Sequence, residues 1–266
     1  VIFLKIINSH KVAVIDRTPL EELDKYYDFK DFLKKKIVKL LMFFFYKKAD
    51  LVISNSKYGC NTLSKYTRSR GEFIYPLLEN KLKYKKKIIK KKSIQILTIG
   101  RLSKEKKIDF MINVLKKNKE LNYKFIILGE GPLETMLRKK VGSKNSKIKI
   151  LKFSKKREKF FLKNSDLYIN SSDFEGFPNS VVNAINHSMP VIASKSYGGI
   201  YEILNFGKNG FLYDLNSKSQ LEKLIFLFYK NRIIFQKKAF LAHKNLEKFS
   251  PKKTITKFEK LIDRTI

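Results

Sequence analysis

Short apolar segments alternate with longer amphipathic segments along most of this chain. The apolar segments are typical of buried strands, which we expect at residues 12–15, 51–54, 73–75, 94–99, 125–128, 148–151, 167–170, 191–193 and 210–213. The amphipathic segments predict helices at residues 31–48, 58–66, 108–117, 133–140, 157–164, 180–188, 200–203, 221–229, 232–248 and 252–262. Repeated strand–loop–helix units imply parallel sheets with helices on both faces. The pattern therefore predicts an α/β fold.

The alternation is interrupted once, in the lysine-dense segment of residues 81–92. A segment with so few apolar positions buries little surface, which is typical of a linker between domains. We therefore expect a first unit at residues 1–80 and a second, Rossmann-like unit at residues 93–248. A last helix falls within residues 249–266.

Size and composition narrow the class of protein. The 266 residues, 43% of them hydrophobic, suffice for one large or two small domains. The chain opens on Val1 inside an apolar run, residues 1–7, so we expect further sequence upstream. That run lacks the flanks of a signal peptide, and the apolar run at residues 37–46 is too short to span a bilayer. Cys60 is the single cysteine, which excludes a disulfide within the chain and favours the cytoplasm. With three histidines, a zinc site is not expected.

The formal net charge of +34 is extreme and has two readings. It could mark a nucleic-acid or membrane-surface protein, or a compositional bias toward lysine. Lysine far outnumbers arginine and is spread along the chain, whereas nucleic-acid readers rely more on arginine. We therefore expect no nucleic-acid partner. The helix at residues 31–48 and the lysine-rich linker could rest on an anionic membrane surface; a solvated face over an ordinary buried stripe is the alternative.

Four loops that follow strands carry candidate chemistry. They are Gly100-Arg-Leu-Ser-Lys-Glu-Lys106, Gly129-Glu-Gly-Pro132, the segment around Glu175-Gly176, and Tyr197-Gly-Gly-Ile200. In parallel α/β sheets, ligands bind beyond the carboxyl ends of the strands. We therefore expect these loops to lie together at one edge of a sheet.

The residue types in these loops suit an anionic ligand rich in hydroxyls. Arg101 and Lys106 can neutralise a diphosphate, and the carboxylate of Glu175 can accept hydrogen bonds from sugar hydroxyls. Phe177-Pro-Asn-Ser180 reads as a helix start with Asn179 or Ser180 as cap, and free N–H groups there suit phosphate. The alternative is a capped surface helix behind an acidic loop. No Asp-x-Asp pair is present to hold a divalent metal, so the two cations would stabilise a leaving diphosphate directly.

The segment from about residue 94 to residue 214 resembles the nucleotide-sugar-binding domain of family 4 retaining glycosyltransferases, group 1 type, which have the GT-B fold. The stretches that carry the resemblance are Gly100-Arg-Leu-Ser-Lys-Glu-Lys106, Leu128-Gly-Glu-Gly-Pro-Leu133, Asn164-Ser-Asp-Leu-Tyr-Ile-Asn-Ser-Ser172, Glu175-Gly-Phe-Pro-Asn179, Met189-Pro-Val-Ile-Ala193 and Gly198-Gly-Ile-Tyr-Glu-Ile203. Lys48-Ala-Asp-Leu-Val-Ile-Ser-Asn-Ser56 resembles the last part of the family's acceptor domain. The resemblance implies a GT-B-like arrangement of two Rossmann-like parallel-sheet domains, the first truncated, with the last helix crossing back to it.

The resemblance also implies roles for individual residues. Glu175, Arg101 and Lys106 match the catalytic positions: the acid contacts the donor sugar and the two cations hold the diphosphate. The matching donor-binding positions are Gly100, Arg101, Lys106, Gly129, Glu130, Glu175, Gly176, Phe177, Pro178, Asn179, Ser180 and Asn183.

Six residues depart from the family pattern or have no firm role. Asn183 stands where the family has a second glutamate that binds the ribose, and Lys107 stands where it usually has glycine. Glu202 matches a common family acid, with a helix-packing or solvated role as the alternative. His10 precedes its strand and receives no role, whereas Asp16-Arg17 follows the strand and faces either the cleft or an ordinary turn.

These inferences predict a metal-independent transferase that moves a sugar, with retention, from a nucleotide-diphosphate sugar to a glycan or lipid-linked acceptor. A donor-binding fragment with impaired catalysis is the alternative, because the first domain is short and Asn183 lacks a charge. The expected setting is synthesis of cell-envelope polysaccharide in the cytoplasm, with the inner face of the membrane as a possible location. Beyond the donor substrate, no cofactor is expected.

Overall fold

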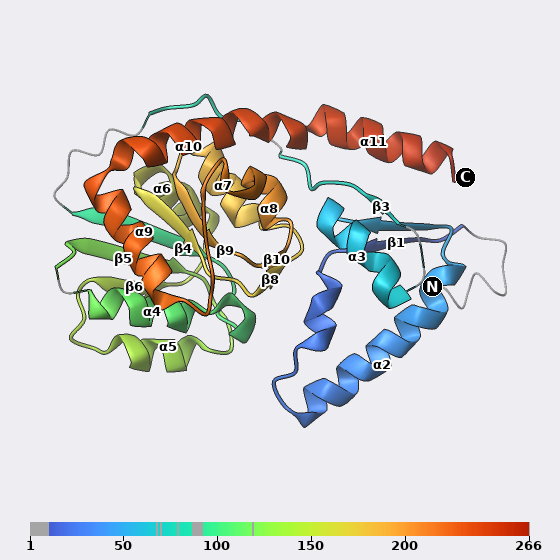
Figure 1. The fold of residues 1–266 in the computed structure, drawn as a ribbon, viewed down its shortest axis with the longest axis horizontal. Helices are drawn as coiled ribbons and strands as arrows, with labels where there is room; N and C mark the ends of the chain where they lie inside the picture. Colours follow the sequence, from blue (N-terminus) through green and yellow to red (C-terminus); the bar gives the residue numbers. More distant parts are fainter. Residues whose placement is uncertain are drawn as a thin grey trace.

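A computed structural model of the protein describes residues 11–67, 69, 71–78, 80–86, 93–118 and 120–265. The apolar run at residues 1–7, His10 and the second half of the expected linker lie outside the described residues. The chain forms two α/β units that lie end to end (Figure 1). The smaller N-terminal unit and the larger C-terminal unit each contain a parallel sheet, which confirms the predicted fold class.

The N-terminal unit contains three strands in the order β1-β2-β3. Its elements are β1 (Ala13–Asp16), η1 (Leu20–Asp24), α2 (Phe29–Phe45), η2 (Tyr46–Lys48), β2 (Leu51–Ser54), α3 (Lys57–Thr67) and β3 (Glu72–Phe73). All pairings are parallel, and Val14 of β1 lies opposite Val52 of β2. The side chain of Val52 packs with α2 and α3 on one face, as part of a cluster with Met42 and Leu63.

The C-terminal unit contains a six-stranded parallel sheet in the order β11-β9-β7-β4-β5-β6. Its elements are β4 (Ile94–Ile99), η3 (Lys104–Lys106), α4 (Ile108–Lys117), β5 (Tyr123–Leu128), α5 (Glu134–Val141), β6 (Ile148–Leu151), α6 (Lys155–Asn164), β7 (Leu167–Asn170), β8 (Phe174–Glu175), α7 (Asn179–Asn186), β9 (Val191–Ser194), β10 (Tyr197–Gly198), α8 (Ile200–Ile203), η4 (Asn205–Gly207), β11 (Phe211–Tyr213), α9 (Lys218–Lys230), α10 (Arg232–Asn245) and η5 (Leu246–Phe249).

Helices cover both faces of this sheet, as the continuous apolar strands predict. Side chains alternate along a strand, so Ile96 of β4 enters the cluster beneath α4 and α9, whereas the next residue, Leu97, enters the cluster beneath α7 and α8. Both side chains are fully buried. The strand order places the ends of β4 and β7 at the centre of the sheet, where the sequence carries its candidate chemistry.

Two features of the connections differ from the expectation. The described part of the lysine-rich segment is docked on the C-terminal unit: the N–H of Leu82 donates to Asn186 Oδ1 at 2.9 Å and that of Lys85 to Ser188 Oγ at 2.9 Å. The pattern of apolar residues does not reveal this docking, because the segment is held by hydrogen bonds from its backbone N–H groups to side-chain acceptors. In addition, β8 and β10 pair as a small separate sheet that was not predicted.

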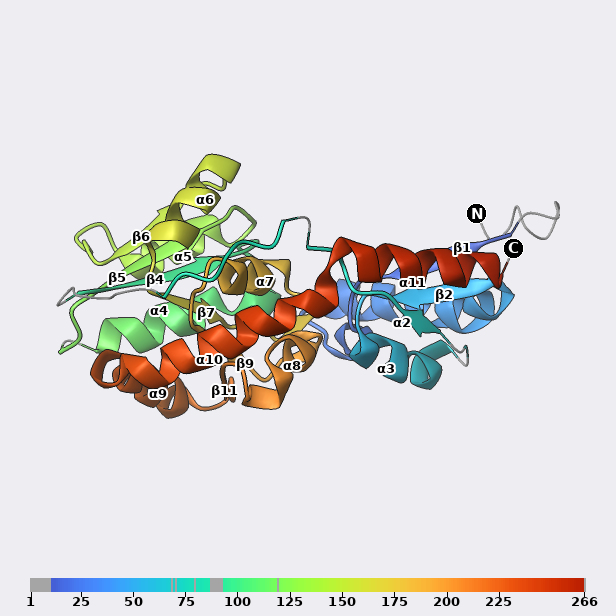
Figure 2. The same ribbon diagram turned by 90° about the horizontal axis from the view of Figure 1, so that it is seen from above.

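The final helix, α11 (Pro251–Asp263), leaves the C-terminal unit and runs along the N-terminal unit (Figure 2). Pro251 stands in the first turn of α11, where backbone N–H groups have no partner within the helix, so the N–H that proline lacks is not missed. The proline also separates α11 from η5. Leu261 packs against Leu51 and Ile53, on the face of the small sheet opposite α2 and α3. The sheet of the N-terminal unit is therefore covered on both faces.

Candidate active site

A pocket of about 560 Å³ lies at the carboxyl edge of the larger sheet. Its walls come from the ends of β4, β5 and β8, the segment that follows β6, and the start of α7. The lining residues are Ile99, Gly100, Arg101, Lys106, Leu128, Gly129, Glu130, Phe153, Glu175, Phe177, Pro178, Asn179 and Ser180. Three of the four expected loops thus meet in one pocket. The loop at Tyr197 does not line the pocket and pairs with β8.

Two glycines allow the loops around the pocket to approach closely. A Cβ atom on Gly129 would lie 1.9 Å from the carbonyl oxygen of Gly100, so the loops after β5 and β4 can meet only without that side chain. A Cβ atom on Gly176 would lie 1.8 Å from the carbonyl oxygen of Arg17. Gly176 therefore brings the loop after β1 of the N-terminal unit against the pocket.

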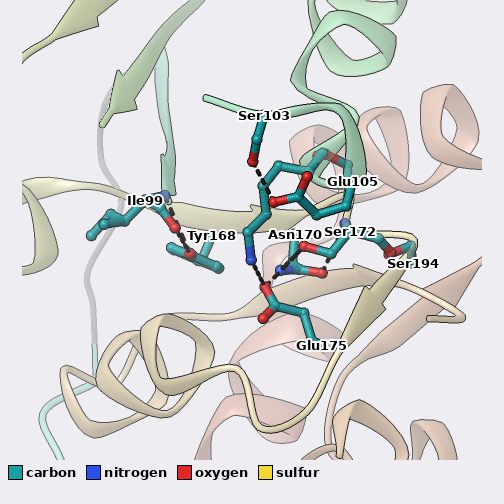
Figure 3. A network of polar contacts seen from close by, with 10 residues as sticks. Ile99, Ser103, Glu105, Tyr168, Asn170, Ser172, Glu175 and Ser194 are labelled. Atoms are coloured by element: carbon teal, nitrogen blue, oxygen red, sulfur yellow. Dashed lines mark hydrogen bonds and ion pairs between the residues drawn. The ribbon is translucent and has the colours of Figure 1, made fainter. Parts of the chain in front are cut away.

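Glu175 and Lys106 form an ion pair at the centre of the site, with side-chain exposures of 15% and 20%. Ser172 Oγ donates a hydrogen bond of 2.9 Å to the same oxygen, Glu175 Oε1 (Figure 3). No hydrogen bond from the described residues occupies Oε2 of Glu175. The carboxylate is thus oriented through one oxygen, and the other oxygen is available to a ligand hydroxyl.

The start of α7 corrects the predicted cap. Pro178 is the N-cap residue, and neither Asn179 nor Ser180 caps the helix with its side chain. The helix begins one residue earlier because the Pro178 carbonyl already accepts from Val181 at 3.0 Å and from Val182 at 3.2 Å. Within the described residues, the N–H of Ser180 donates to no acceptor. An uncapped helix start next to the pocket favours an anion there.

Arg101 and Glu130 line the pocket from the loops after β4 and β5. Arg101 is exposed, which leaves its guanidinium free to reach a ligand. Glu130 lies 3.9 Å from the Lys152 ammonium, an exposed pair that contributes little stability. Phe153, which follows β6, completes this part of the pocket lining.

Asn183 does not line the pocket with the other expected residues. Its Nδ2 donates to Oε1 of Glu158 on α6 at 3.1 Å. Glu158 is 8% exposed, and Lys155 lies 3.1 Å from its other oxygen. Asn183 therefore links α7 to α6.

Lys107 adopts the left-handed conformation, with φ 47° and ψ 36°. Glycine reaches this region without the cost that a Cβ atom imposes, which explains why glycine is usual at this position in the family. The Lys107 ammonium lies 3.3 Å from Asp173 Oδ2.

The two units contact each other beside the pocket through charged groups. Lys25, in the loop before α2, lies 3.2 Å from Asp173 Oδ1. Glu202 of α8 accepts from the N–H groups of Lys57 at 3.1 Å and Tyr58 at 2.7 Å. The hydroxyl of Tyr75 also donates to Glu202 at 2.6 Å, and burial, followed by this hydrogen bond, raises the pKa of Tyr75. Glu202 is therefore a helix cap between units and not a solvated acid.

Asp16 and Arg17 differ in what they face. Asp16 lines a separate pocket between η1 and α2, and burial raises the pKa of its carboxyl. The carbonyl of Arg17 accepts from Asn55 Nδ2 at 2.8 Å and lies against Gly176.

Sequence reasoning missed four residues that shape the site: Ser172, Asp173, Phe153 and Lys25. Ser172 ends the Asn164–Ser172 motif, and Asp173 follows it, so their proximity to Glu175 was a usable signal. Phe153 and Lys25 carry no such signal, because their positions depend on the ends of β6 and η1. In the described part of the chain, no group of three or more acidic, histidine or cysteine side chains could hold a metal ion; metal independence stays a prediction.

The fold defines the class: a two-unit parallel α/β protein of GT-B type. The chain belongs to the family of glycosyl transferases group 1, whose model matches residues 80–248. Curated relatives include an uncharacterized glycosyltransferase of Methanocaldococcus jannaschii, 29% identical over 216 residues that cover 75% of this chain and 52% of the relative.

A second relative, from Campylobacter jejuni, is N-acetylgalactosamine-N,N'-diacetylbacillosaminyl-diphospho-undecaprenol 4-alpha-N-acetylgalactosaminyltransferase, 28% identical over 201 residues that cover 73% of this chain and 53% of the relative. This chain spans about half the length of these two relatives.

Solved structures share the fold. HepE of Anabaena, in complex with UDP and glucose, matches with a TM-score of 0.79 at 18% identity, over 98% of this chain and 73% of that one. TarM of S. aureus matches with a TM-score of 0.77 at 21% identity, over 97% of this chain and 52% of that one.

Proposed function

We propose that this chain binds a nucleotide-diphosphate sugar and transfers the sugar, with retention and without a metal ion, to a glycan or lipid-linked acceptor. One observation carries the proposal: the pocket at the carboxyl edge of the large sheet joins two cations, a helix start and an oriented carboxylate. Cations and helix N–H groups suit the diphosphate. The free oxygen of Glu175 suits a hydroxyl of the donor sugar.

In this proposal the bond from the anomeric carbon to the diphosphate oxygen breaks, and its electron pair leaves with the nucleoside diphosphate. The acceptor hydroxyl forms the new bond on the same face of the sugar, and its proton passes to the departing diphosphate. Arg101, Lys106 and the N–H of Ser180 stabilise the charge that develops on the leaving group. Lys106 also holds Glu175 in place.

Calorimetry with UDP-sugars and GDP-sugars tests donor binding, and product formation tests turnover. We expect Arg101→Ala to weaken binding of the nucleoside diphosphate by roughly tenfold or more, because a charge-assisted contact is lost. Arg138→Ala, at an exposed site on α5, is the matched control. Equal donor binding by the parent chain and Arg101→Ala would rule out the assigned site. The anomeric configuration of the product, determined by NMR, tests retention, and activity in excess EDTA tests metal independence.

A donor-binding chain with impaired turnover is the second candidate. It is favoured by Asn183, whose amide is engaged with Glu158 and lies outside the pocket lining. Donor binding without product from any acceptor would support it. Asn183→Glu is the informative variant, since an increase in donor affinity would assign the position to the nucleotide.

The acceptor class is supported by the names of two relatives. The Campylobacter jejuni relative is named for a diphospho-undecaprenol-linked substrate, and another relative, from Erwinia amylovora, is an amylovoran biosynthesis glycosyltransferase. We therefore include envelope polysaccharide synthesis at the inner membrane face in the proposal. In the described part of the chain, no helix is long and apolar enough to cross a membrane.

A further inference from the structure

Asp173 lies between two lysines that belong to different units. Its Oδ1 is 3.2 Å from the ammonium of Lys25 in the N-terminal unit, and its Oδ2 is 3.3 Å from the ammonium of Lys107 in the C-terminal unit. The Asp173 side chain is 14% exposed, so salt screens these ion pairs less than pairs on an open surface. Asp173 precedes Glu175 by two positions but does not line the pocket. It can therefore act on the pocket only through its neighbours.

The chain around Asp173 fastens together the two loops that carry the central ion pair of the site. The N–H of Asp173 donates to the carbonyl of Glu105, in the loop after β4, at 2.8 Å. Ser171 Oγ donates to the carbonyl of Lys106 at 2.6 Å. The segment of residues 171–175 and the loop after β4 are thus held to each other on both sides of the ion pair.

The contact with Asp173 explains a lysine where the backbone favours glycine. Lys107 has φ 47° and ψ 36°, a left-handed conformation that costs a residue with a Cβ atom more than it costs glycine. Glycine would hold the same backbone but would supply no ammonium for Oδ2 of Asp173. The ion pair of Lys107 offsets that cost, whereas nothing in the backbone conformation does.

The N-terminal unit reaches the same two loops through the short segment between η1 and α2. Lys25 of this segment lies 5.9 Å from the ring centre of Phe174, the residue before Glu175. Two residues further on, the ring centre of Tyr27 lies 5.0 Å from the ammonium of Lys104, in the loop after β4. One segment of the N-terminal unit therefore contacts both loops that carry the central ion pair.

We propose that Asp173 is a positioning residue for the transfer reaction. Through Lys107 and Lys25 it holds the two loops in the geometry that the donor requires. This inference rests on the proposed function, in which a cation and a carboxylate meet the diphosphate and the sugar at the same time. A misplacement of about 1 Å can cost about a hundredfold in rate. The N-terminal unit thus contributes to the pocket through Lys25, which does not line it.

Two variants and two controls test this role. Lys107→Gly removes the ammonium and relieves the left-handed backbone, so it separates positioning from folding. Asp173→Asn keeps the shape of the side chain and weakens both ion pairs. Lys107→Arg keeps the charge. Asp109→Asn on α4 is the matched control for the loss of an ion pair, because its partner Lys140 lies 3.5 Å away and neither residue lines the pocket.

We expect Lys107→Gly and Asp173→Asn to lower kcat about tenfold or more, while KM for the donor changes less than about threefold, because the donor contacts remain and the reacting geometry is lost. Both controls should keep kcat within about twofold of the parent chain. Lys107→Gly should unfold at about the same urea concentration as the parent, since the relieved backbone offsets the lost ion pair. A purely structural role predicts the reverse: a loss of stability with kcat unchanged.

The contribution of the N-terminal unit is tested by Lys25→Met, alone and combined with Asp173→Asn. We expect Lys25→Met to lower kcat about threefold or more, and the combined variant to have the kcat of Asp173→Asn, because both substitutions remove the same ion pair. If the two losses multiply in the combined variant, Lys25 does not act through Asp173 and this part of the proposal is wrong.

Amide hydrogen exchange follows the two loops without any donor. We expect Asp173→Asn to speed exchange at residues 104–107 and 171–175 about tenfold or more, and Asp109→Asn to leave it unchanged. Unchanged kcat in Lys107→Gly, or unchanged loop exchange in Asp173→Asn, overturns the proposal. If Asp173→Asn does not fold, Lys107→Gly serves for both measurements. A parent chain that binds no UDP and transfers no sugar, but whose loop exchange responds as stated, contradicts only the proposed function.

Discussion

The carboxylate of Glu202 in α8 accepts the backbone N–H of Tyr58 in the first turn of α3, at a distance of 2.7 Å. The bond joins two residues that are 144 positions apart in the chain and belong to different units. An acid at a helix N-terminus satisfies free N–H groups and interacts favourably with the helix dipole. Glu202 therefore fixes α3 against the unit that carries the pocket.

Replacing Glu202 with alanine should lower the free energy of unfolding by about 2 kcal/mol, because two N–H groups and the Tyr75 hydroxyl lose a charged acceptor. Urea unfolding measures the change. Glu134→Ala, which removes an exposed pair with Arg138 on α5, should cost less than about 0.5 kcal/mol. Equal losses in the two variants would show that Glu202 does not join the units.

A close approach between the units leads to a second prediction. Gly176→Ala places a Cβ atom 1.8 Å from the Arg17 carbonyl oxygen and 2.7 Å from Asn55 Nδ2. The units must separate or the loops must shift, which should cost roughly 2 kcal/mol or more in unfolding free energy. Gly100→Ala is the control, since its nearest neighbour would be the flexible Lys106 side chain at 3.8 Å. If Gly176→Ala unfolds at the same temperature as the parent chain, the close contact between the units is contradicted.

Glu175→Gln should separate sugar recognition from diphosphate binding. The amide keeps the shape of the side chain but weakens both the Lys106 ion pair and the hydrogen bond to a sugar hydroxyl. We expect turnover to fall roughly a hundredfold or more, whereas affinity for free UDP changes only about threefold. Steady-state kinetics and calorimetry measure the two effects. If UDP affinity falls as far as turnover, Glu175 acts on the diphosphate and its assigned role is wrong.

Asp16 predicts a pH dependence of stability. Burial raises the pKa of its carboxyl above the ordinary value, so the ionised form costs stability when the chain is folded. That cost is absent in acid, where Asp16 is protonated in both states, and it appears as pH rises through the raised pKa. Asp16→Asn should therefore be more stable than the parent chain at neutral pH.

The advantage of Asp16→Asn should shrink as pH falls toward the usual carboxyl range. Urea unfolding at neutral pH and in mild acid measures it. Asp28→Asn, at the exposed cap of α2, controls for loss of a charge alone. If the stability advantage of Asp16→Asn does not change with pH, it has a cause other than the ionisation of Asp16.

Many elements and most of the pocket were accessible from the sequence. The strands at Leu51–Ser54, Ile94–Ile99, Ile148–Leu151 and Leu167–Asn170 match the predicted bounds, because a buried strand between two helical layers reads as a continuous apolar segment. The loops with Arg101, Lys106 and Glu175 meet because parallel strands share one carboxyl edge. Two other features could not be predicted from the sequence. The start of α7 depends on hydrogen bonds to the Pro178 carbonyl, and the role of Asn183 depends on its distance from Glu158 in the fold.

The sequence alone thus determined the α/β class, the layered sheet and the group of residues at its edge, because periodicity and strand ends are local properties. Tertiary structure alone decided which charges pair and which surfaces stay open. Lys106 could serve a diphosphate or Glu175 by its sequence, and only the folded loops place it on the carboxylate. Likewise, the apolar positions of α2 could face the sheet or the solvent. The fold packs Val38 and Met42 in the cluster against the sheet, whereas Phe29, Leu33 and Phe44 stay exposed.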